Sequence, residues 1–130
     1  MAEADYSVGR DLDAPYEEAL ARVRQALTSE GFGVIAEIDV QKTMKEKLGV
    51  DGRPYVILGA CRPQAAHAAL GVEPDVGLLL PCNVVVYETG SGTRVAAVNA
   101  GAMLGMVGNE ELGPIADDIQ DRLGRVIEKL

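Results

Sequence analysis

The chain has 130 residues, the size of a single domain, and its 48% hydrophobic and 25% charged residues exclude disordered and collagen-like proteins. Twelve Lys and Arg residues against twenty Asp and Glu residues give a net charge of −8, and the chain contains no Trp and one Phe. Because nucleic-acid binding relies on a basic face or on aromatic stacking platforms, we expect no nucleic-acid partner. We expect one domain over residues 1–130.

The first half of the chain predicts alternating strands and helices. After a strand over 6–12, Asp13 is placed to cap a helix that ends before Gly31 and carries an apolar stripe (Tyr16, Ala19, Leu20, Val23 and Leu27). A strand over 32–38 follows, in which the even positions (Phe32, Val34, Ala36 and Ile38) are predicted to face the core and Glu37 to face water. We then expect a short helix near 40–48 and an interior strand over 54–61.

The second half predicts a hairpin between two helical regions. Pro63 opens a short helix, a strand spans 77–88, and a turn at 90–92 leads to a strand over 94–99. A glycine-rich loop over 101–108 and a cap at Asn109 precede a last amphipathic helix. The order β-α-β-α-β-α-β-β-α leaves too little chain for parallel crossovers. We therefore predict an α+β fold with a mostly antiparallel sheet of about five strands, two long helices and two short helices.

Three segments resemble the domain-of-unknown-function 302 family over nearly the whole chain. They are residues 32–45, the GACRPQAAHAAL run at 59–70 and the GLLLPCNVVV run at 77–86. The resemblance implies a TATA-binding-protein-like fold type, with long helices on a curved antiparallel sheet, and it implies homodimers. The family supplies no activity, and fold alone does not assign one.

Two positions depart from the family pattern that this resemblance brings. Arg62 stands where Asn is usual between the Cys and the Pro. Asn99 and Ala100 stand where Asp-Pro is usual. If the usual Asn and Asp are functional groups, this chain has an altered function.

Two cysteines and the one histidine form the candidate chemical site. Cys61 ends a predicted strand at the start of a helix, where unpaired N–H groups favour a thiolate, and Cys82 opens the next strand. If the strand ends adjoin, His67 can join them. Three interpretations stay open. The first is buried structural cysteines. The second is a Zn or Cu(I) site made by Cys61, Cys82 and His67, with Met103 or Met106 as a soft further ligand for copper. The third is thiol chemistry in which Cys61 is the nucleophile or sulfur carrier, Cys82 resolves it and His67 is a nearby base.

A local basic segment predicts a site for a small anion. Between residues 42 and 62, five basic residues (Lys42, Lys45, Lys47, Arg53 and Arg62) outnumber two acidic residues, a local charge of +3 in an acidic protein. The ordinary alternative is a solvated helix face. The candidate ligand-binding residues are Lys42, Lys45, Arg53, Arg62 and Asn83.

The sequence favours a cytoplasmic protein without a membrane partner. Residues Met1–Asp5 lack the basic and apolar regions of a signal peptide, and the apolar stretch from Val76 to Val86 is shorter than the roughly 20 residues of a membrane helix. We predict a non-enzymatic domain that binds a small ligand or a soft metal. The alternatives are a thiol-dependent enzyme or sulfur carrier that uses Cys61, and an interaction homodimer without a ligand.

Overall fold

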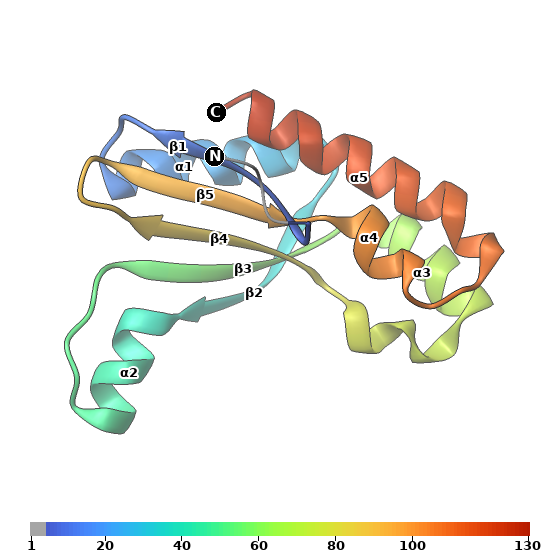
Figure 1. The fold of residues 1–130 in the computed structure, drawn as a ribbon, viewed down its shortest axis with the longest axis horizontal. Coiled ribbons are helices and arrows are strands. Elements are labelled where there is room, and N and C mark those ends of the chain that lie inside the picture. The colour runs from blue at the N-terminus through green and yellow to red at the C-terminus, as the bar shows by residue number, and fades with distance from the viewer. Residues whose placement is uncertain (1–4) are drawn as a thin grey trace.

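The computed structural model describes residues 5–130, and its centre is a five-stranded sheet. The strand order is β1-β5-β4-β3-β2, and every neighbouring pair is antiparallel (Figure 1). The strands are β1 (Ser7–Leu12), β2 (Gly33–Asp39), β3 (Tyr55–Cys61), β4 (Cys82–Glu88) and β5 (Thr93–Val98). Residues 1–4, which form most of the segment used to argue against a signal peptide, lie outside the described residues.

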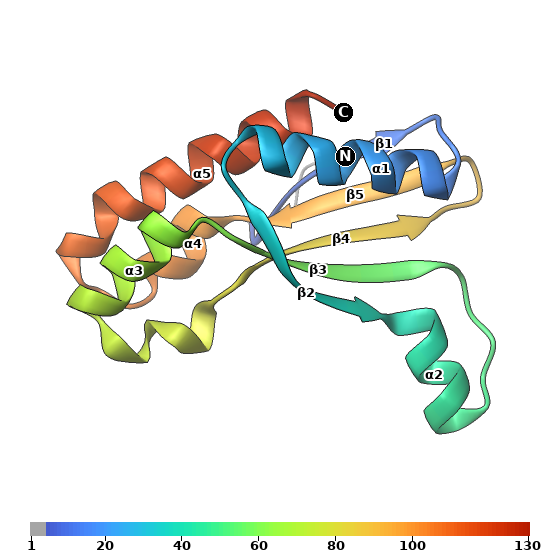
Figure 2. The ribbon, with the colours of Figure 1, turned by 180° about the vertical axis from the view of Figure 1, so that it is seen from behind.

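The two long helices share one face of this sheet. The helices are α1 (Tyr16–Ser29), α2 (Val40–Leu48), α3 (Pro63–Val72), α4 (Ala100–Gly105) and α5 (Gly113–Glu128), with 3-10 turns η1 (Pro74–Leu79) and η2 (Glu110–Leu112). α1 and α5 contact each other and the sheet, whereas α2 projects from one end (Figures 1 and 2). No helix within residues 5–130 is long and apolar enough to cross a membrane.

The predicted α+β class and antiparallel sheet are confirmed. The element order also agrees, except that the structure adds the short helix α4 and the two 3-10 turns. The glycine-rich segment over 101–108 was expected to be a loop, and for its first part this was wrong. Asn99 begins α4 there, because its side-chain oxygen accepts a hydrogen bond from the amide of Ala102 at 3.0 Å.

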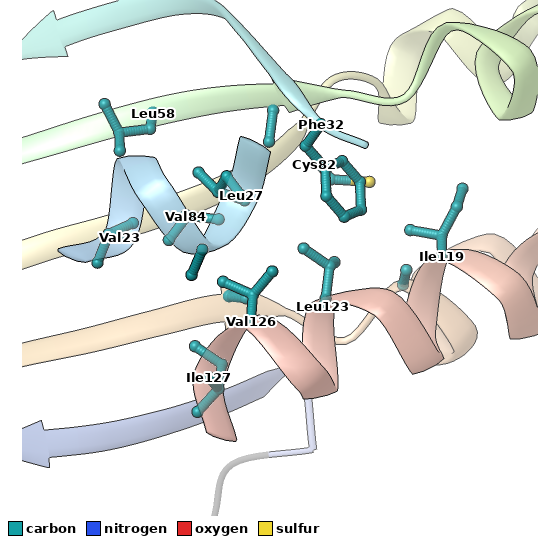
Figure 3. Close-up of a cluster of buried hydrophobic side chains, with 14 of the residues drawn as sticks. Val23, Leu27, Phe32, Leu58, Cys82, Val84, Ile119, Leu123, Val126 and Ile127 are labelled. Carbon is teal, nitrogen blue, oxygen red and sulfur yellow. The ribbon is translucent and has the colours of Figure 1, made fainter. Parts of the chain in front are cut away.

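The core lies between the inner face of the sheet and the two long helices. Val56 and Leu58 of β3 and Val84 of β4 are buried. Ile57 and Val85, which point to the opposite face, are partly exposed, as strand geometry requires when one face is covered. Facing them are buried side chains of α1 and α5, among them Val23, Leu27, Leu123 and Val126 (Figure 3). The sheet's opposite face, called the outer face below, has no long helix packed on it.

The prediction for strand β2 was wrong beyond its first residues. Val34 and Ala36 pair with consecutive residues of β3, so Ile35 forms a bulge between them. Such an extra residue reverses the inward and outward alternation beyond it. Ala36 therefore turns outward, and Glu37 turns inward, where it forms an ion pair with Arg24 of α1.

Two further local predictions were wrong. The strand expected over 77–88 begins only at Cys82, because Pro74 opens the 3-10 turn η1 and buries Val76 beneath it. Asp13 does not cap α1; Pro15 occupies that position and makes no side-chain cap. The predicted cap at Asn109 is present, at the start of η2.

Candidate functional site

A cavity of about 250 Å³ lies at the end of the sheet where β3 leads into α3. Most of its wall is apolar: Phe32, Ile35, Leu70, Leu80, Pro81 and Ile119. Cys61, Arg62 and Cys82 complete this wall with polar or polarisable groups. We call this cavity the thiol pocket, and it brings together residues from β2, β3, β4, α3, η1 and α5.

The antiparallel pairing of β3 with β4 brings both cysteines to this pocket. Cys82 pairs with Ala60, the residue immediately before Cys61. Cys61 is half-buried, whereas Cys82 is 3% exposed and lies beside Phe32 (Figure 3). Both thiols are free. The pairing of Ala60 with Cys82 shows that the two strand ends adjoin, the condition on which the candidate site depended.

The surroundings of Cys82 suppress its ionisation. Burial raises the pKa of the Cys82 thiol to about 11, and the neighbouring Cys61 adds to this effect. At neutral pH Cys82 therefore remains a protonated, largely apolar side chain. A protonated Cys82 suits the interpretation as a buried structural cysteine better than the interpretations as a thiolate metal ligand or a resolving nucleophile.

The predicted metal site of Cys61, Cys82 and His67 is not assembled. His67 is exposed on α3 and does not line the thiol pocket. Within the described part of the chain, no three His, Cys, Asp or Glu side chains lie close enough to hold a metal ion. Met106, considered as a soft ligand, is 75% exposed and lines a different hollow beside η1.

Arg62 carries the positive charge at the thiol pocket. Its Nη1 atom lies 3.3 Å from Oδ2 of Asp118, and its side chain is only 22% exposed. Asp118 also accepts two hydrogen bonds from Nε of Arg122, at 3.1 and 3.2 Å. Two guanidinium groups thus share one carboxylate, which leaves this trio with a net charge of +1.

Comparison with known proteins identifies the group to which this fold and pocket belong. The family model described as "Domain of unknown function DUF302" matches residues 8–130. The chain belongs to the DUF302 family. A crystal structure of an uncharacterized conserved DUF302 protein from Bacillus stearothermophilus is similar, with 33% sequence identity and a TM-score of 0.88, over 97% of this chain and 98% of that chain. The search of curated proteins gave no match.

The structure explains one of the two departures from the usual DUF302 pattern as conservative. Asn99 caps α4, and Asp would supply the same acceptor at this position. The Pro that usually follows would occupy the first helical position, where Ala100 stands and where no N–H is needed. Asn99-Ala100 and the Asp-Pro expected from the resemblance are therefore both compatible with this helix start.

The other departure changes the pocket of this DUF302 protein. Arg62 is the residue before α3, with φ −102° and ψ 105°, and its side chain makes no capping hydrogen bond. An Asn with this backbone conformation is a strong helix cap. This chain therefore has a guanidinium beside the thiol pocket, at a position where the Asn expected from the resemblance would cap the helix.

The predicted ligand-binding set (Lys42, Lys45, Arg53, Arg62 and Asn83) does not form one site. Lys42 and Lys45 line a separate polar hollow at α2, where Nζ of Lys45 lies 2.9 Å from Oδ1 of Asp51. Arg53 lies over the ring of Tyr87, 5.1 Å from its centroid. Asn83 is exposed on β4. Of this set, the thiol pocket includes Arg62 alone.

Sequence reasoning missed the acidic partner of Arg62 and the aromatic part of the wall. The spacing of Asp118 and Arg122 on one helix signals an ion pair, but nothing in the sequence shows that Arg62 joins it. Phe32 was expected in the core, and its position at the edge of an opening depends on tertiary packing.

Proposed function

We propose that this DUF302 protein is a non-enzymatic binding domain that holds a small, largely apolar molecule in the thiol pocket. The observation that carries the proposal is the apolar cavity at the end of the sheet, with Arg62 and Cys61 as its accessible polar groups. Binding sites typically combine apolar walls with a few polar groups that orient the ligand. The volume of about 250 Å³ is below the roughly 300–1,000 Å³ of drug-sized sites, so we expect a small ligand.

The chemistry of the wall favours holding a molecule over transforming it. The Cys82 thiol stays protonated at neutral pH, because burial raises its pKa. His67, the general base in our alternative interpretation, is exposed outside the pocket. The remaining wall is mostly aliphatic and aromatic, which supplies contact area for a ligand.

A titration with 1-octanol, followed by backbone amide NMR, tests this proposal. We expect shifts concentrated at the thiol pocket. The variant Ala66→Leu places a larger side chain in the pocket wall and should weaken binding about tenfold, because the added methyl groups take the ligand's space. Ala68→Leu, on the exposed side of the same helix, is the matched control and should bind as the unmodified protein does. An absence of shifts at the pocket would contradict the proposal.

A thiol-dependent enzyme or sulfur carrier is the second candidate function. The partial exposure of Cys61 in the pocket wall, next to the start of α3, favours it. This function needs an accessible and reactive Cys61 thiol, so iodoacetamide at pH 7 should modify Cys61 in the folded protein at least as fast as it modifies a cysteine in an unstructured peptide. Modification of Cys61 only after unfolding would remove this candidate.

An interaction homodimer is the third candidate, and the outer face of the sheet supports it. The registers align Ile38, Ile57, Val85 and Ala96 across four neighbouring strands on this face. Such a continuous apolar row is typical of an interface between subunits. We expect a dimer in analytical ultracentrifugation and a monomer for Val85→Asp, whereas Leu78→Asp, at an exposed position on η1, should leave the mass unchanged. A monomeric unmodified protein would exclude this candidate.

A further inference from the structure

The unused hydrogen-bonding capacity of Arg62 indicates what kind of ligand the thiol pocket takes. A guanidinium has five N–H donors. In residues 5–130 the Arg62 side chain donates no hydrogen bond, and its one ion-pair contact is the 3.3 Å approach to Asp118. No side-chain nitrogen in this part of the chain is buried without a partner, so the unpaired donors of Arg62 have access to solvent, and Arg62 itself lines the thiol pocket.

The charge balance around Arg62 selects the ligand's charge. Arg62 and Arg122 contribute two positive charges, and the Asp118 carboxylate that they share contributes one negative charge. A ligand with one negative charge brings this group to neutrality. A phosphate monoester carries nearly two negative charges, so its binding would leave nearly one excess negative charge close to the Asp118 carboxylate.

We propose that the ligand is a monocarboxylate with a short apolar body, whose carboxylate pairs with Arg62 while the body lies against Phe32, Ile35 and Leu70. This inference rests on the proposed binding function and adds the chemical class of the ligand. Arginine and carboxylate match in geometry, because two parallel N–H groups meet two oxygens. The apolar side chains beside Arg62 accommodate the remainder of the molecule.

Paired probes of equal chain length test the inference. Octanoate, 1-octanol and octyl phosphate are titrated at neutral pH and constant ionic strength, with amide NMR shifts at the pocket as the readout. We expect octanoate to bind about tenfold more tightly than 1-octanol, the difference made by a charge-assisted hydrogen bond. Octyl phosphate should bind more weakly than octanoate.

Arg62→Asn isolates the guanidinium. This exchange supplies a helix cap at the same position, so we expect it to fold. Octanoate affinity should fall to the level of 1-octanol, and 1-octanol affinity should stay the same. Arg22→Asn removes the same charge from the exposed face of α1 and is the matched control, for which neither affinity should change.

Asp118→Asn provides a test in the opposite direction. Asp118 competes with the ligand for Arg62, so its neutralisation should strengthen octanoate binding about threefold and leave 1-octanol unchanged. Equal binding of octanoate and 1-octanol by the unmodified protein would overturn the monocarboxylate inference while leaving the binding function intact. Shifts from none of the three probes would overturn both.

Discussion

The middle of the sheet and its end beside α3 differ in how completely other elements cover them. In the middle, Leu58 and Val84 are fully enclosed by α1 and α5. At the end, α3 and η1 leave an opening between Cys61 and Leu70. The same kinds of apolar side chain occur in both places, so their residue types do not separate core from site. Incomplete coverage makes the second region available to a ligand.

Truncating one leucine in each region to alanine should give the largest difference in the free energy of unfolding. Leu123→Ala, in the closed middle, should lower the free energy of unfolding by about 3 kcal/mol, because it removes buried contacts and leaves a cavity. Leu70→Ala, in the pocket wall, should cost about 1 kcal/mol or less, since Leu70 is already 43% exposed. Urea denaturation measures both values. Equal losses would show that the pocket is closed in solution.

Cys82 lies at the boundary between the two regions, because it is buried in the core and also lines the pocket, and its ionisation should change the stability of the protein. Its pKa is raised from 9.0 to about 11 in the folded protein, so its contribution to stability is complete below pH 9 and is lost as the pH rises through 11. The free energy of unfolding should therefore fall by about 2–3 kcal/mol over this interval on account of Cys82.

Denaturation curves at pH 8 and pH 11 test this expectation. Cys82→Ala is less stable at pH 8 because it loses buried volume, but it should decline less with pH than the unmodified protein. Parallel declines would contradict the raised pKa of Cys82.

At the pocket mouth we expect a substitution to stabilise the protein. Arg62→Asn should gain about 1 kcal/mol from capping α3 and lose about 0.5 kcal/mol from the ion pair with Asp118. The net result is a slightly higher melting temperature in scanning calorimetry. A lower melting temperature would mean that Arg62 stabilises the unmodified protein more than the introduced Asn cap stabilises the variant.

Glu30, which follows α1, forms ion pairs with residues at the end of α5, and for it we expect only a direction of change in stability with pH. Hydrogen bonds from Lys129 and Arg125 lower the pKa of the Glu30 carboxyl below its usual value. Its contribution to stability is therefore present above pH 4.5 and is lost as the pH falls through the lowered pKa. Glu30→Gln should be less stable than the unmodified protein at pH 7, and their melting temperatures should converge in acid.

The regular elements could be predicted because their signals are local. The apolar stripes of α1 and α5 and the start of α3 at Pro63 follow from spacings within one element. The bulge at Ile35 was not predictable, because β2 continues its apolar pattern across it and only pairing with β3 reveals the extra residue. The position of His67 outside the thiol pocket was not predictable for a similar reason, because the orientation of α3 depends on distant packing.

The candidate site was predictable in part. The approach of Cys61 and Cys82 follows from adjacent strand ends, and a positive group beside them was expected at Arg62. The participation of Asp118 required the tertiary structure, since α5 reaches Arg62 from the far end of the sequence. Charge density along the chain grouped Lys42, Lys45 and Arg53 with Arg62, whereas the fold separates them from it.

The bulge lies in β2, which is an edge strand of the sheet. An outermost strand has unpaired backbone groups that invite edge-to-edge growth into fibrils. The extra residue at Ile35 interrupts the regular row of backbone groups along this edge. Glu37 carries a charge on the inner face, which disfavours the addition of another strand. We therefore expect the bulge that places Ile35 in the pocket wall to disfavour edge-to-edge pairing as well.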